Sequence, residues 1–178
     1  SMRLFELTNA VIDVSEDENN LYLYRFAPVK VEEILRDLFT SHDDMIGRKN
    51  LTIDFDVPKD LPTVQADRTR IQFALQIVFE NSLIYTPEKG KVAIKARQVG
   101  GEVVVSFKDN GIGVSLDDIE HIFSKFYRSN TARRTDTEGM GIGLYMAKNI
   151  IEKHRGKIWV ESRGEGDGSE FTVTLPVG

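Results

Sequence analysis

Hydrophobic and polar residues repeat with two different periods along this chain. Residues 51–57 alternate strictly between apolar and polar side chains, which is typical of a half-buried strand. After Asp67, apolar residues recur at three- and four-residue spacing, which is typical of an amphipathic helix with an aspartate at its N-terminus. The pattern therefore predicts both strands and helices: the two-residue alternation marks the strands, and the three- to four-residue spacing marks the helices.

The predicted elements alternate along the sequence. Strands are expected at residues 21–26, 51–57, 91–99, 102–108, 158–161 and 171–175, with a hairpin at Gly100-Gly101. Helices are expected at residues 3–14, 29–45, 67–83 and 144–154, with a short one at 116–126 in an otherwise irregular stretch. A mixture of this kind predicts an α/β fold in which helices cover one face of a sheet.

Composition and charge narrow the class of protein. Of 178 residues, 40% are hydrophobic and 29% are charged, which indicates a globular domain rather than a disordered chain. The net charge of -5 provides no global basic field for nucleic acid or anionic membrane. The absence of cysteine excludes a disulfide scaffold and a thiolate nucleophile. No apolar run approaches the roughly 20 residues of a membrane span.

Two glycine clusters are candidates for phosphate and nucleotide chemistry. The first, 109–113, ends a predicted strand, and the second, 139–144, opens a predicted helix. Glycines let the backbone approach a ligand closely, and a helix N-terminus offers unpaired N–H groups to phosphate. Each cluster alone is also compatible with an ordinary turn. The second cluster does not follow a strand within a βαβ unit, so it is not a dinucleotide fingerprint.

Two further features point to the same chemistry. Asn81 lies within an apolar helix, where an amide is unfavourable unless it is used, and its carbonyl oxygen can bind Mg²⁺. The segment 123–128 carries two phenylalanines, Phe123 and Phe126, expected to pack a loose stretch against the core. Its basic residues and those just after it favour phosphate as a ligand, with a solvated basic loop as the alternative. These residues are Lys125, Arg128, Arg133 and Arg134.

In order and spacing, four segments resemble the catalytic and ATP-binding domain of sensor histidine kinases. The wider family includes gyrase, the heat-shock chaperones of the same fold and MutL. Asn81 matches the N box, and residues 109–113 match the first glycine box. Residues 123–128 match the phenylalanine box, and 139–144 the second glycine box. The resemblance covers almost the whole chain from Tyr22 onward.

The resemblance implies a two-layer α/β sandwich of a mixed sheet and three main helices, with a mobile ATP lid over 114–138. It implies that Asp109 accepts a hydrogen bond from the adenine amino group, Asn81 holds Mg²⁺, and Tyr85 lines the pocket. An ionised carboxylate suits that role because it only accepts hydrogen bonds. Gly111 and Gly113 would give adenine room. The residues that would contact the phosphates at the helix start are Gly139, Gly141, Gly143 and Leu144. Lys125 and Arg128 are further candidates for phosphate contacts.

The chain departs from the family pattern at its histidines. The family's phosphoacceptor is a histidine followed by an acidic residue, with a proline a few positions later. His42 precedes an aspartate but lacks that proline, and His121 and His154 lack the acidic neighbour. We therefore interpret all three as surface or core residues and expect the acceptor outside this chain. Residues 1–15 are then the tail of a truncated dimerisation helix or a linker, and 16–178 the ATP-binding domain.

Two isoleucines occupy positions where the family places polar residues. Ile77 stands where gyrase and MutL carry a catalytic glutamate, and Ile84 stands where kinases usually carry a lysine. Isoleucine cannot act as a general base, which argues against a standalone ATPase. Two hypotheses remain: the catalytic domain of a histidine kinase, or a degenerate pseudokinase module that binds nucleotide or a partner.

The first hypothesis implies specific partners. They are the protein's own dimerisation and phosphoacceptor domain and a response regulator, with no nucleic acid. The full-length protein is expected to be a homodimer and this fragment a monomer that does not phosphorylate itself. The expected location is cytoplasmic, with anchoring of the whole protein in the inner membrane left open.

Overall fold

The computed structural model describes residues 23–135 and 141–178. The predicted helix at 3–14 lies outside these residues. In chain order the elements are β1 (Ala27–Val29), α2 (Val31–Ser41), α3 (Asp43–Arg48), β2 (Thr52–Asp56), β3 (Val64–Ala66), α4 (Arg68–Tyr85), β4 (Lys91–Val99), β5 (Glu102–Asp109), α5 (Leu116–Ile119), α6 (Asn130–Thr135), α7 (Gly143–Lys153), β6 (Lys157–Glu161) and β7 (Ser169–Pro176). Within the described residues, no helix is long and apolar enough to cross a membrane.

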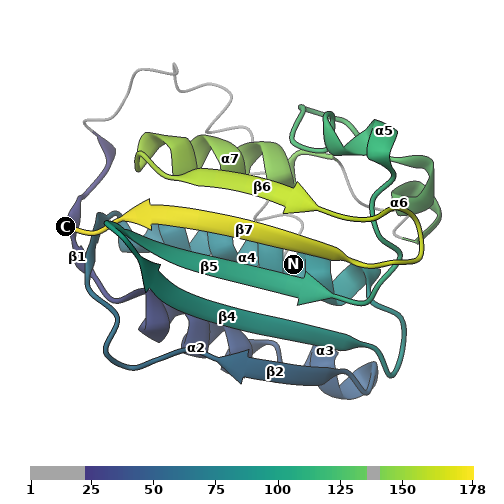
Figure 1. Ribbon diagram of the computed structural model, residues 1–178, viewed down its shortest axis with the longest axis horizontal. Helices are drawn as coiled ribbons and strands as arrows, with labels where there is room; N and C mark the ends of the chain where they lie inside the picture. Colours follow the sequence, from purple (N-terminus) through teal and green to yellow (C-terminus); the bar gives the residue numbers. More distant parts are fainter. Residues whose placement is uncertain (1–22, 136–140) are drawn as a thin grey trace.

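A five-stranded sheet with the order β2-β4-β5-β7-β6 forms one layer of the molecule. The β2–β4 pair is parallel and the other pairs are antiparallel, so the sheet is mixed, as expected. Helices α2, α4 and α7 lie together against one face of it (Figure 1). The prediction of a two-layer sandwich covered on one face is confirmed.

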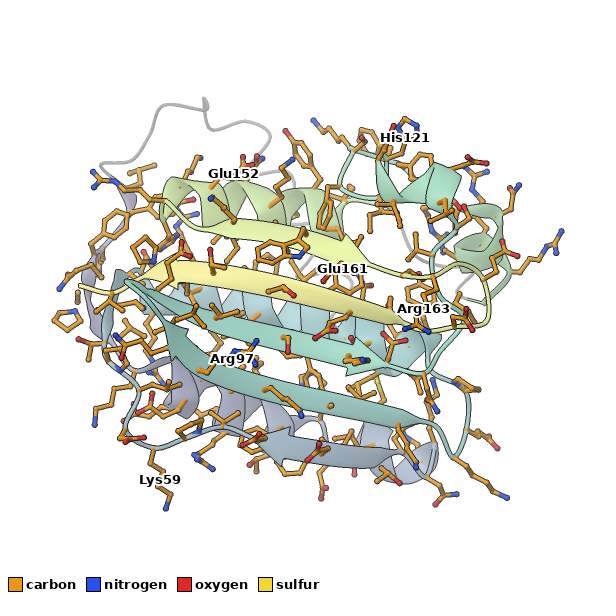
Figure 2. The ribbon with its side chains drawn as sticks, viewed as in Figure 1. Lys59, Arg97, His121, Glu152, Glu161 and Arg163 are labelled. Atoms are coloured by element: carbon orange, nitrogen blue, oxygen red, sulfur yellow. The ribbon has the colours of Figure 1, made fainter. Side chains whose placement is uncertain are left out.

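The core lies between this sheet and its helices. Alternation along β5 turns Val103, Val105 and Phe107 inward, and all three are fully buried. Phe79 of α4 meets Phe107 with ring centroids 5.9 Å apart. The opposite face of the sheet is open, and Figure 2 shows the side chains of Arg97 and Glu161 projecting from it. The core therefore lies on the helical side of the sheet, and the loop after β5 meets the end of α4 at Tyr85.

Asp67 caps α4 as the sequence predicts. Its carboxylate accepts a hydrogen bond from the backbone N–H of Arg70 at 3.1 Å. The same carboxylate accepts from the N–H of Arg25 at 3.0 Å, so it also holds the segment that leads into β1. A cap of this type satisfies one of the N–H groups that a helix start leaves unpaired.

The prediction of a strand at residues 21–26 is wrong for its described part. Strand β1 begins only at Ala27 and pairs with β3, a short strand in the loop after Pro58 that the sequence pattern does not reveal. Before it, the Tyr24 ring lies 4.2 Å from the Arg70 guanidinium and 5.4 Å from the His154 ring. Side-chain contacts, rather than a strand ladder, hold this segment in place.

Two helix predictions are also corrected. The helix expected at 29–45 is two helices, α2 and α3, with His42 between them and Val29 in β1. The helix expected at 116–126 is reduced to α5, because the chain turns after it and Phe126 adopts a φ of 63°. Helix α6 lies in a stretch that the sequence pattern treats as irregular. The remaining strand and helix predictions agree with the structure to within a few residues.

Candidate nucleotide-binding site

Asp109 is a buried carboxylate at the end of β5, with 6% of its surface exposed. Its Oδ1 accepts from the N–H groups of Gly111 (2.9 Å) and Ser169 (3.3 Å), and its Oδ2 accepts from the Ser169 hydroxyl (2.9 Å). Burial raises the pKa of Asp109, while the bonds from Gly111 and Ser169 oppose that rise. The carboxylate is therefore held in one orientation and retains acceptor capacity for an amino group.

The first glycine cluster folds directly against the end of α4. A Cβ on Gly111 would lie 2.3 Å from the Tyr85 carbonyl oxygen, and the N–H of Ile112 donates to that oxygen at 3.1 Å. Gly113 has a φ of 71°, and a Cβ there would lie 2.2 Å from the Gly164 carbonyl oxygen. Side chains are excluded at both positions, and the close approach brings the Tyr85 backbone beside the Asp109 loop.

Asn81 presents an unused amide from α4. The residue is half-buried, and its side chain makes no hydrogen bond to the residues that the structure describes. One turn earlier, Ile77 approaches Gly143, where a Cβ would lie 3.1 Å from the Ile77 Cγ2. The start of α7 therefore packs on the α4 face that carries Asn81, and the N box and second glycine box come together.

The second glycine cluster is crowded by the phenylalanine box. Gly141 has a φ of 71°, and a Cβ there would lie 2.7 Å from the Tyr127 carbonyl oxygen. The N–H of Phe126 donates to the Gly141 carbonyl at 2.8 Å. Helix α7 begins at Gly143 with no side-chain cap, and Leu144 packs against the core. Gly139 lies outside the described residues.

The two phenylalanines of the predicted box differ in their environments. Phe123 packs edge-on to Phe171, with ring centroids 6.3 Å apart, whereas Phe126 is 61% exposed. The expectation that both pack against the core is therefore wrong for Phe126. Its positive φ turns the chain toward Gly141 and leaves the ring outside.

The two predicted cations are placed differently. The Nζ of Lys125 lies 5.6 Å from the ring centre of Tyr145 in the first turn of α7, close to the second glycine cluster. Arg128 donates through Nη2 to the Ala132 carbonyl at 3.1 Å, which ties it to α6. The Arg128 side chain also lies beside the second glycine cluster, since a Cβ on Gly141 would lie 2.9 Å from its Cγ, and part of its guanidinium already has a partner.

Sequence reasoning missed three residues that support the site. Ser169 orients Asp109 from β7, sixty positions away. Lys49 donates to the Leu83 and Ile84 carbonyls at 2.6 and 3.0 Å and so holds the last turn of α4, and burial lowers its pKa. Glu80, next to Asn81, forms a buried pair with His42 at 2.8 Å. A single sequence carries no signal for partners so far apart.

The three histidines differ in burial. His42 and His154 are buried, and His121 is exposed. The Nδ1 of His154 donates to the Ile150 carbonyl at 2.7 Å and its Nε2 accepts from the Asp67 N–H at 3.0 Å. Burial lowers the pKa of His154, so the neutral ring satisfies both contacts.

The donor set fits Mg²⁺ only when it is shared with a phosphate ligand. Among residues 23–135 and 141–178, no group of three or more His, Cys, Asp or Glu could hold a metal ion. Mg²⁺ commonly keeps several waters and takes one or two protein oxygens together with substrate phosphates. The Asn81 amide makes no other described hydrogen bond, so its oxygen could be the one protein ligand in such an arrangement. It could not form a complete metal site by itself.

The oriented Asp109 carboxylate, the close approach of Gly111 and Gly113 to neighbouring backbone and the half-buried Asn81 on α4 fit a nucleotide-binding α/β domain. The chain belongs to the histidine kinase-, DNA gyrase B- and HSP90-like ATPases, because the model of that family matches residues 66–178.

Relatives of the chain are sensor kinases. It is 34% identical over 172 residues to the adaptive-response sensory kinase SasA of Synechocystis sp., covering 96% of this chain and 44% of SasA. It is 30% identical to the sensor-like histidine kinase SenX3 of Mycobacterium tuberculosis, covering 98% of this chain and 42% of SenX3. The chain thus spans less than half the length of these relatives.

Solved structures show the same fold. The nucleotide-free catalytic domain of histidine kinase ThkA matches with a TM-score of 0.75 and 30% identity, covering 86% of this chain and 96% of that domain. Full-length ShkA in complex with AMPPNP matches with a TM-score of 0.79 and 28% identity, covering 98% of this chain and 36% of ShkA. The described fold is therefore that of a histidine kinase catalytic domain.

Proposed function

We propose that this chain is the ATP- and Mg²⁺-binding catalytic domain of a two-component sensor histidine kinase. The observation that carries the proposal is the Asp109 carboxylate, which is buried and held in one orientation by Gly111 and Ser169. The γ-phosphoryl group would go to a histidine on a dimerisation domain outside this chain. Residues 1–15 would be the tail of that domain's helix or a linker.

Each residue contributes positioning or charge to this transfer. Asp109 would accept from the adenine amino group, with Tyr85, Gly111 and Gly113 around the base. Asn81 would hold Mg²⁺, which neutralises charge that develops on the phosphates. The phosphates would meet the second glycine box at the start of α7, with basic residues nearby. The residues proposed for that end are Gly139, Gly141, Gly143, Leu144, Lys125 and Arg128.

The chain would work only with partners. They are its own dimerisation and phosphoacceptor domain and the receiver domain of a response regulator, with the full-length protein a homodimer and this fragment a monomer. One solved match is histidine kinase ThkA in complex with the response regulator TrrA, at 25% identity and a TM-score of 0.79. That complex supports a regulator as a partner of this kinase class. The domain would act in the cytoplasm, and it would not bind nucleic acid.

A binding module without phosphotransfer is the second candidate. Ile77 is 6% exposed and packs against Gly143, so no general base stands at that position. Ile84 is half-buried and carries no charge toward a phosphate.

The test is phosphotransfer from γ-labelled ATP and Mg²⁺ in the full-length protein. We expect an acid-labile phosphate that is lost in Asp109→Asn and Asn81→Ala, and no incorporation into the 178-residue chain alone. ATP binding without any acid-labile phosphate would support the binding module. Absence of ATP binding to a folded chain would refute the kinase and the nucleotide-binding module, and would leave only a module that binds a partner.

A further inference from the structure

The Ser162 hydroxyl lies at a junction of three backbone segments. Its Oγ donates to the Gly168 carbonyl at 2.7 Å and accepts from the N–H of Val114 at 3.1 Å. The N–H of Gly164 lies 3.3 Å from the same oxygen. The Gly164 carbonyl also lies 3.3 Å from this oxygen. A hydroxyl has one proton to donate, and the shorter contact, to the Gly168 carbonyl, takes it. The residue joins the end of β6 to the first glycine loop and to the segment before β7.

The loop that follows Ser162 runs alongside the first glycine cluster. The N–H of Gly166 donates to the Ile112 carbonyl at 2.7 Å, and the N–H of Gly168 donates to the Gly111 carbonyl at 3.1 Å. Arg163 marks this loop in Figure 2, at the end of the sheet where α5 and α6 lie. Residues 162–168 therefore pack along the loop that begins at Asp109 and bind it through two backbone hydrogen bonds.

The two loops pack closely at Gly168, where the backbone leaves no room for a side chain. A Cβ on Gly168 would lie 2.0 Å from the Asp109 carbonyl oxygen. The next residue, Ser169, donates to the Asp109 carboxylate. A shift of Gly168 would therefore move Ser169 and change how the carboxylate is held. Ser162 is the side chain that binds the Gly168 carbonyl and so opposes that shift.

We propose that Ser162 is a positioning residue for the nucleotide site. It holds residues 162–168 against the first glycine loop, and through Gly168 and Ser169 it fixes the orientation of Asp109. It acts on the ligand only through these residues. The nucleotide part of this inference rests on the proposed function, whereas the positioning part can be measured in the free protein.

The first test is amide hydrogen exchange of the free chain. In Ser162→Ala we expect the Val114 and Gly166 amides to exchange about 10-fold faster, because without the hydrogen bonds of the hydroxyl the loop opens locally more often. The Phe107 amide in the sheet should be unchanged. Ser162→Thr, which keeps the hydroxyl, should restore slow exchange. Ser106→Ala is the matched control, since that serine lies on β5 and its hydroxyl bonds to none of the described residues. Unchanged exchange at Val114, or equal acceleration at Phe107, would overturn the positioning role.

The second test is ATP titration by calorimetry with Mg²⁺. Ser162→Ala should weaken ATP binding about 3- to 10-fold, corresponding to one net hydrogen bond. In a Ser169→Ala background the same change should have less than about a 2-fold effect, because residues that act through one another are not additive. An equal factor in both backgrounds would show that Ser162 does not act through Ser169. A wild-type chain that binds no ATP would refute the proposed function and leave the exchange result standing.

Discussion

Removal of the His42 ring should destabilise the domain strongly, because it would leave a buried carboxylate without its cation. The His42 Nε2 lies 2.8 Å from the Glu80 Oε1, and the side chains are 7% and 9% exposed. The Nδ1 faces the Leu38 carbonyl at 2.8 Å. Both of these partners only accept hydrogen bonds, so the geometry requires a proton on each ring nitrogen.

The magnitude follows from what remains after the change. In His42→Ala, the Glu80 Oε1 keeps only the bond from the Gln76 side chain, at 2.8 Å. Removing one partner of a buried ion pair typically costs about 3–5 kcal/mol of unfolding free energy. Glu80→Ala should cost a similar amount, and the double variant should be more stable than the sum of the two losses predicts.

The pH dependence has a definite sign. The hydrogen bond to Glu80 raises the pKa of His42 above its usual 6.5, although burial opposes this. A raised pKa in the folded state contributes stability that is complete below the unfolded value. This contribution is lost as the pH rises through the folded value. Wild type should therefore exceed His42→Ala in stability by more at about pH 6 than at about pH 9.

Urea unfolding measures both effects. Trp159 is the sole tryptophan and lies on β6, so its fluorescence reports on the sheet. Arg97→Ala on the open face is a suitable control, and it should change the unfolding free energy by less than about 0.5 kcal/mol. A loss below about 1 kcal/mol in His42→Ala, or a loss independent of pH, would refute the charged pair.

Three further predictions concern the nucleotide site. Asp109→Asn should weaken ATP binding by about 1.5–3 kcal/mol, because one acceptor becomes a donor; unchanged affinity by calorimetry with the fold intact would contradict the assigned role. Ile84→Lys should strengthen binding of ATP more than of adenosine, by less than about 1.5–3 kcal/mol, because the lysine must be ordered; a variant that melts much lower and gains nothing from ATP would place Ile84 in packing alone. Within the lid expected over 114–138, amides of residues 129–135 should exchange quickly without nucleotide; exchange as slow as in β5 would refute a mobile lid.

The sequence by itself determined the elements whose pattern is local. Alternation in β2, the Asp67 cap and the Gly100-Gly101 hairpin depend on neighbours a few residues apart, so each could be predicted from its own segment. The order of the four boxes resembles that of histidine kinase ATP-binding domains, and this resemblance named the residues of the proposed nucleotide site. Asp109, Tyr85 and Gly111 were predicted as a group and do lie together.

Tertiary structure decided whatever depends on residues that are distant in the chain. The break between α2 and α3 falls at His42, whose partner Glu80 is 38 positions later. Ser169 orients Asp109 across 60 positions, and Ser162 reaches Val114 across 48. The exposure of Phe126 follows from a positive φ and a bond to Gly141, and neither has a periodic signal. Such contacts depend on how the two layers pack. The site residues could therefore be predicted from the sequence, whereas the residues that hold them in place could not.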